Sequence, residues 1–135
     1  MENLHPLFLI GAVVVLLLMV LYFLPIGLWF TAMVSGVNIS LMQLLLMRLR
    51  KTPVGVIVRA LIVATEGGIN LNGEQLEILF LSGGDVNNVV NGMVAAKRAG
   101  FPLSFENAVK ADAQGLNILE SVQEKMRETQ KVQFE

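Results

Sequence analysis

The feature that most constrains this chain is a long stretch without charge at its N-terminal end. After Glu2 the next charged residue is Arg48, so the 45 positions 3–47 hold no Asp, Glu, Lys or Arg. Residues 48–135 carry 20 of the 21 charged side chains. About 20 apolar residues already cross a bilayer as a helix. The sequence therefore predicts a membrane anchor over residues 1–51 and a separate module over residues 52–135.

The first apolar part of the anchor, residues 7–24, matches one membrane crossing. Its 18 residues form about 27 Å of helix, close to the roughly 30 Å hydrocarbon core of a bilayer. A cleavable signal peptide has a positively charged start, and no Lys or Arg precedes Leu7. We expect an uncleaved span.

Basic residues close the uncharged stretch on its C-terminal side only: Arg48, Arg50 and Lys51, with Lys or Arg absent from the N-terminal side. Positive charge next to a span favours the cytoplasmic side of the membrane. This predicts a membrane protein with residues 48–135 in the cytoplasm. The bilayer is then its first partner, with these three side chains at the interface.

The anchor is interrupted after residue 24. Pro25 breaks a helix, and the aromatic side chains around it favour a membrane interface: Tyr22, Trp29 and Phe30. A second segment, 26–47, is split by the sequence SGVN into two nine-residue pieces, each only about 14 Å long as a helix. It lies shallowly in the inner leaflet, or it crosses back so that both chain ends are inside. We favour the single span.

The module is expected to be all-α, with four to five short helices and a polar last helix. Residues 63–86 align with residues 95–118 at a spacing of 32, with five identities. Residues that stop or start helices recur in this alignment, which predicts tandem helical pairs. They are Gly68, Asn72, Gly83, Asp85, Gly100, Ser104 and Gly115.

No pattern in the chain indicates catalysis. There is no cysteine, and the single histidine, His5, lies far in sequence from the carboxylates of the module. The stretch LSGGD (81–85) resembles an ATPase signature, but a phosphate-binding G-x-x-x-x-G-K-[ST] loop is absent and Asp85 would repel phosphate. The net charge of −1 gives no basic surface for nucleic acid. We expect no enzyme activity, cofactor, metal or small-molecule substrate.

Several linked stretches resemble the N-terminal region of bacterial flotillin-like proteins of the FloA type. They are SGVNISL through MRLR, the helix end ATEGGINL, the helix start LSGGDVNNVVN, and LSFE with DAQGLNILESVQ. The resemblance covers residues 23–123, and the sequence after Gln123 is expected to depart from the family. Family members continue into a band-7 (SPFH-type) domain and a coiled coil, so the resemblance implies a chain that ends before them.

The resemblance implies a membrane-anchored, non-enzymatic scaffold or adaptor of the bacterial inner membrane. It also implies that the protein organises membrane microdomains and assembles with itself or with a larger flotillin-like partner. The alternative is a small accessory subunit of a larger membrane enzyme, transport or secretion complex. In that case residues 7–47 would pack against other transmembrane helices.

Overall fold

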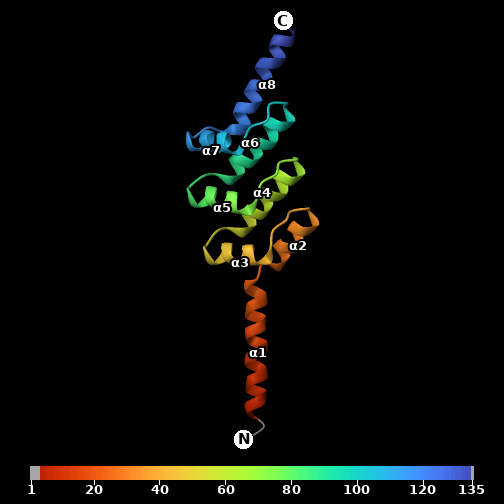
Figure 1. Cartoon of the computed structure of the whole chain (residues 1–135), viewed down its shortest axis with the longest axis vertical. Coiled ribbons are helices and arrows are strands. Elements are labelled where there is room, and N and C mark those ends of the chain that lie inside the picture. Colours follow the sequence, from red (N-terminus) through yellow and green to blue (C-terminus); the bar gives the residue numbers. More distant parts are fainter. Residues whose placement is uncertain (1–3, 135) are drawn as a thin grey trace.

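The computed structural model describes residues 4–134 and confirms the all-α class. Eight helices and no strands occupy this part of the chain. In Figure 1, α1 forms a rod along the long axis of the molecule, and the other helices are stacked in layers beyond its C-terminal end. The helices are α1 (Leu4–Phe23), α2 (Ile26–Val34), α3 (Leu41–Leu49), α4 (Val54–Glu66), α5 (Gly73–Leu81), α6 (Val86–Arg98), α7 (Phe105–Ala113) and α8 (Ile118–Phe134).

The layers follow one another at a constant spacing. The short helices α3, α5 and α7 begin at residues 41, 73 and 105, and the long helices α4, α6 and α8 begin at 54, 86 and 118, so each step is 32 residues. α2 and α3 form the first layer, α4 and α5 the second, α6 and α7 the third, and α8 follows (Figure 1). This is a short solenoid, in which each layer packs mainly on its neighbours.

The same cap starts each short helix. The side chains of Ser40, Asn72 and Ser104 accept hydrogen bonds from backbone amides three residues ahead, at 3.1, 2.8 and 3.2 Å. In α3 and α5 a glutamine side chain also bonds back to the cap residue and completes a capping box. A polar cap satisfies amides that have no partner within the helix, so it fixes where the helix starts.

Left-handed backbone conformations end the helices at repeated positions. Gly36, Gly68 and Gly100 follow α2, α4 and α6, with φ of 81, 74 and 88°. At the end of the short helices the equivalent positions are Lys51, Gly83 and Gly115, with φ of 62, 87 and 79°. Only the lysine carries a side chain, which costs roughly 1 kcal/mol or more in this region of backbone space. The remaining predicted residue, Asp85, caps α6.

One hydrophobic core runs through all layers. The even-numbered helices stack on one another, α4 on α2, α6 on α4, and α8 on α6. Ala32, Ala64 and Ala96 occupy the same position in successive layers and are 0, 1 and 1% exposed. Small side chains at these positions allow the helices to approach closely. The approach is tightest at Gly92, where an added Cβ would lie 2.2 Å from Cγ2 of Ile118.

The structure assigns the second apolar segment to the stack. α2 packs on α4, and α3 contacts both α2 and α4. Leu44 of α3 is 0% exposed within the same core cluster as Ile57 and Leu61. Residues 35–40 separate the two helices, so the segment does not form one continuous membrane-length helix. How deeply this layer enters a bilayer stays a prediction.

Candidate membrane-anchoring site

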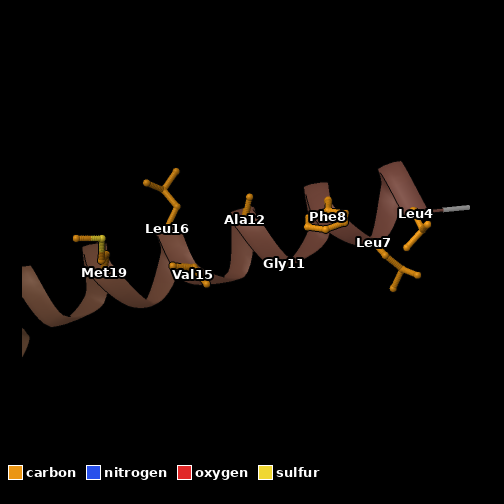
Figure 2. Close-up of a pocket in the computed structure, with 8 residues that line it drawn as sticks. All are labelled: Leu4, Leu7, Phe8, Gly11, Ala12, Val15, Leu16 and Met19. Atoms are coloured by element: carbon orange, nitrogen blue, oxygen red, sulfur yellow. The ribbon is translucent and has the colours of Figure 1, made fainter. Parts of the chain in front are cut away.

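The first part of the candidate anchoring site is the exposed apolar surface of α1. None of its residues is buried, and its mean hydropathy is 2.8. Among the described residues it is the one helix that is long and apolar enough to cross a membrane. Figure 2 shows one face, where Gly11 and Ala12 form a shallow notch between larger side chains such as Phe8 and Leu16. In water such a surface is strongly unfavourable, because apolar area costs about 25 cal/mol per Å² exposed.

The C-terminal end of α1 is joined to α3. The Arg48 guanidinium donates a hydrogen bond to the carbonyl oxygen of Phe23 and lies 5.9 Å from the centroid of the Phe23 ring. The last carbonyls of a helix have no partner within it and carry a partial negative charge, so a cation stabilises them. Leu45 lines an apolar crevice between the two helices together with Met19 and Phe23 of α1. α3 therefore lies directly against the end of α1.

The first layer has apolar side chains on its exposed surfaces, on both α2 and α3. They are Ile26, Phe30, Met33, Val34, Met42, Leu46 and Leu49, each at least 39% exposed. At equivalent positions, the exposed side chains become more polar in the layers farther from α1. The exposed positions of Met33 and Val34 are taken by a threonine and a glutamate in α4, and by Lys97 and Arg98 in α6.

The basic residues surround the end of α3. Arg48 is in its last turn, Arg50 caps it, and Lys51 follows, all three exposed. Nη2 of Arg50 lies 3.2 Å from Oε1 of Glu77, a residue of α5 that is only 4% exposed. The second oxygen of that carboxylate has no hydrogen-bond partner among residues 4–134. One predicted interface residue, Arg50, thus also ties the first layer to the second.

The predicted aromatic residues have different surroundings. Tyr22, near the end of α1, is 89% exposed, and Phe30 of α2 is 58% exposed. Trp29 is half-buried and packs against the core cluster. The sequence reasoning did not identify Leu46 and Leu49 as surface residues. Leu46 lies in the uncharged stretch 3–47, which gives no indication of which side of a helix faces out, and Leu49 is a single apolar residue between Arg48 and Arg50.

A second polar feature joins α6, α7 and α8. The Asn88 amide nitrogen donates to Oδ1 of Asp112 at 2.8 Å and to the carbonyl oxygen of Leu116 at 2.9 Å. Its oxygen accepts from the backbone amide of Ile118 at 3.0 Å. This network joins α6 to α7 within the third layer and to the start of α8. Over the described residues no group of three or more His, Asp and Glu is arranged to hold a metal ion.

An exposed apolar helix, a first layer with apolar surfaces and a stack of helical layers together define a membrane-associated helical-repeat protein. Comparison with known families identifies the family within this class. The family model of the flotillin-like protein FloA matches residues 6–132, and the chain belongs to that family. The resemblance is therefore confirmed, and the match extends beyond residues 23–123 at both ends. The expected departure after Gln123 is wrong, because the match continues to residue 132.

Curated relatives agree with the family model. The chain is 47% identical to a flotillin-like protein FloA of Parabacteroides distasonis over 119 residues, which are 87% of this chain and 36% of the relative. It is 43% identical to that of Alkaliphilus metalliredigens, over 85% of this chain and 35% of the relative. The chain thus spans about a third of the length of these relatives. No solved structure matches the chain significantly.

Proposed function

We propose that this chain is a membrane-anchored scaffold or adaptor module. In this proposal α1 crosses the bilayer, the first layer lies in the headgroup region of the cytoplasmic leaflet, and α4 to α8 project into the cytoplasm. The observation that carries the proposal is the change of exposed surface along the stack, from apolar on α1 and the first layer to charged on α6. A bilayer presents the same change of polarity with depth.

The dimensions support this placement. The 20 residues of α1 are about 30 Å long, which equals the hydrocarbon thickness. Because the first layer lies at the end of α1, it coincides with the interfacial region, which is roughly 5–7 Å deep on each side. Arg48, Arg50 and Lys51 are then at the level of anionic headgroups, where each contributes about 1 kcal/mol to binding.

The scaffold role follows from the family and the architecture. A stack of helices presents an extended surface to other proteins. The resemblance implies microdomain organisation and oligomeric assembly with itself or a larger flotillin-like partner. The accessory-subunit alternative rests on the exposed surface of α1, which can contact other transmembrane helices as well as lipid.

Cysteine labelling tests the topology, since the chain has no native cysteine. In intact cells, an impermeant maleimide should label Asn3→Cys and should label Gln130→Cys only after the cells are opened. Protection of Asn3→Cys in intact cells would refute the single span and support the hairpin. An environment-sensitive dye at Leu49 should report an apolar setting in liposomes, whereas the same dye at Glu66, the control in the second layer, should report water.

A mass measurement separates the two roles. The complex is extracted in a gentle detergent and its native mass is determined. A homo-oligomer, or a complex with a full-length flotillin-like protein alone, supports the scaffold. Stoichiometric retention in an enzyme, transport or secretion complex would refute it and support the accessory subunit.

A further inference from the structure

The helices α2, α4 and α6 end on the same side of the stack, one above the other (Figure 1). A glycine in the left-handed conformation follows each of them, at Gly36, Gly68 and Gly100. The turn after α4 is contacted by a lysine of α6, because the Lys97 ammonium donates a hydrogen bond to the carbonyl oxygen of Gly68. Carbonyl groups at the end of a helix lack partners within it and carry a partial negative charge, so a cation stabilises them.

The turn after α2 has a different neighbour at the equivalent position. Thr65 of α4 stands where α6 has Lys97. A Cβ added to Gly36 would lie 3.9 Å from Cγ2 of Thr65, whereas a Cβ added to Gly68 would lie 2.7 Å from the nitrogen of Lys97. Among residues 4–134 no donor bonds to the carbonyl oxygen of Gly36. A groove of about 340 Å³ lies at this turn, between the first and second layers.

The lining of the groove suits a small cation that carries N–H groups. Its polar groups come from the turns after α2 and α4 and include the side-chain amides of Asn38 and Asn70, and no charged residue is among the described residues that line it. Glu66, the exposed residue next to Thr65, adds a negative charge at its border. A primary ammonium has three N–H donors and no acceptor, so carbonyl oxygens are suitable partners for it.

The groove also lies where the surface changes from apolar to polar. Val34, near the end of α2, is 71% exposed, and Glu66 has the equivalent position at the end of α4. In the placement proposed above, on which this inference rests, the first layer occupies the headgroup region. The groove is then at the aqueous edge of that region. The ammonium of an ethanolamine headgroup can reach this edge, because a short carbon chain joins it to the phosphate.

We propose that the groove binds the primary ammonium of a phosphatidylethanolamine headgroup, with the carbonyl oxygen of Gly36 as one acceptor. The lipid supplies to the turn after α2 the ammonium that Lys97 supplies to the turn after α4. A choline headgroup does not replace it, since a quaternary nitrogen has no N–H. Weak binding is sufficient, because headgroups beside an anchored protein have a high effective concentration. The first layer thus distinguishes two lipids of the same net charge.

Native mass spectrometry of the full chain tests the site. The protein is taken from maltoside micelles that contain equal amounts of phosphatidylethanolamine and phosphatidylcholine with identical acyl chains. Retained phosphatidylethanolamine should exceed phosphatidylcholine by about fivefold or more, which corresponds to the net gain from one hydrogen bond. The N,N-dimethyl lipid keeps one N–H and should also be retained above phosphatidylcholine. Equal retention of the ethanolamine and choline lipids overturns the proposal.

A lysine placed in the groove should compete with the lipid. Thr65→Lys gives α4 the residue that α6 has at this position, so the preference for phosphatidylethanolamine should disappear. Val63→Lys is the matched control, because Val63 is on the same helix, is 37% exposed and does not line the groove. It adds the same charge and should leave the preference unchanged. Loss of the preference in both variants, or in neither, would refute the assigned site.

Labelling in liposomes tests whether the ammonium comes from the lipid. Asn38→Cys should react with a maleimide severalfold more slowly in liposomes with phosphatidylethanolamine than in liposomes of phosphatidylcholine alone. Asn87→Cys, an exposed residue of the third layer, should react equally in both. A lipid preference in micelles with equal labelling of Asn38→Cys in liposomes would overturn the lipid as the ligand and favour a lysine of another protein.

Failure of this proposal is distinguishable from failure of the proposed function. Retention in micelles does not depend on where the first layer lies in a bilayer. Equal retention of the two lipids, together with an apolar signal from the dye at Leu49, therefore refutes the ammonium site and leaves the placement intact. A signal of water from the dye at Leu49 refutes the placement itself, and with it the access of lipid headgroups to the groove.

Discussion

Replacing Gly92 by alanine tests whether the close contact between α6 and α8 organises the far end of the stack. An added Cβ would lie 2.2 Å from Cγ2 and 2.5 Å from Cβ of Ile118. Ile118 is 3% exposed and its backbone amide is bonded to Asn88, so it cannot turn away without moving α8. Overpacking of this kind costs about 1–3 kcal/mol. The helix gains about 0.5–1 kcal/mol when alanine replaces glycine.

The net expectation is a destabilisation of about 1–2 kcal/mol. For a module of this size that lowers Tm by roughly 5–10 °C, measured by circular dichroism of the full chain in detergent micelles. Gly27→Ala is the matched control, since Gly27 is also in a helix and a Cβ there meets nothing within 4 Å. Its Tm should stay the same or rise slightly.

Hydrogen exchange shows which helices the Gly92→Ala substitution destabilises. In Gly92→Ala the amides of residues 118–122 should exchange faster, because α8 is displaced from α6, while those of α4 should change little. A Tm equal to or above that of the unchanged protein would refute the close packing of these helices. So would an equal loss of protection in α4 and α8.

Three further substitutions test other contacts by the same thermal assay. Lys51→Gly should stabilise the module by about 0.5–1 kcal/mol because it relieves a left-handed backbone, whereas Gly83→Ala, at the equivalent position, should destabilise it. Asn88→Ala removes three hydrogen bonds that join α6 to α7, to the loop after α7 and to the start of α8, and should cost about 2–3 kcal/mol, while its exposed neighbour Asn87→Ala should stay within about 0.5 kcal/mol. Arg50→Met leaves the buried carboxylate of α5 unpaired and should cost about 1–3 kcal/mol, a loss that should shrink when that carboxylate is replaced too. An unchanged Tm in any of the three would contradict the corresponding contact.

Local chemistry made much of the fold predictable. Gly68 and Gly100 were expected to end helices and Asn72 to start one because these functions depend on a residue's own backbone preference or side chain. The all-α class followed from the same signals. The bond from Arg48 to Phe23 could not be predicted, since it joins residues 25 positions apart through a packing of α1 on α3 that no local pattern specifies.

In the first layer, the lack of charged residues concealed the 32-residue repeat. Residues 31–54 match residues 63–86 at seven of 24 positions, more than the five that revealed the downstream repeat. The matched pairs are Ala32/Ala64, Gly36/Gly68, Asn38/Asn70, Gln43/Gln75, Leu44/Leu76, Leu49/Leu81 and Val54/Val86. The lack of charge favours a membrane location for the second apolar segment, 26–47. Because of that interpretation, the segment was not aligned with the module. Surface polarity varies between the layers, whereas a buried alanine (Ala32, Ala64, Ala96) and a polar N-cap (Ser40, Asn72, Ser104) recur in each.

The constant spacing makes the stack adjustable in length. Ala96 occupies in its layer the position that Ala64 occupies in the layer before. Deleting residues 64–95 would therefore join Val63 to Ala96 in register and remove one complete 32-residue layer. The remaining helices would keep the same kinds of neighbour, and α8 would come nearer to α1 by about 8–10 Å, the distance between packed helices. Duplicating the same residues would move it away by the same amount. The number of layers therefore sets the distance between the last helix and the end of the anchor, in steps of one layer.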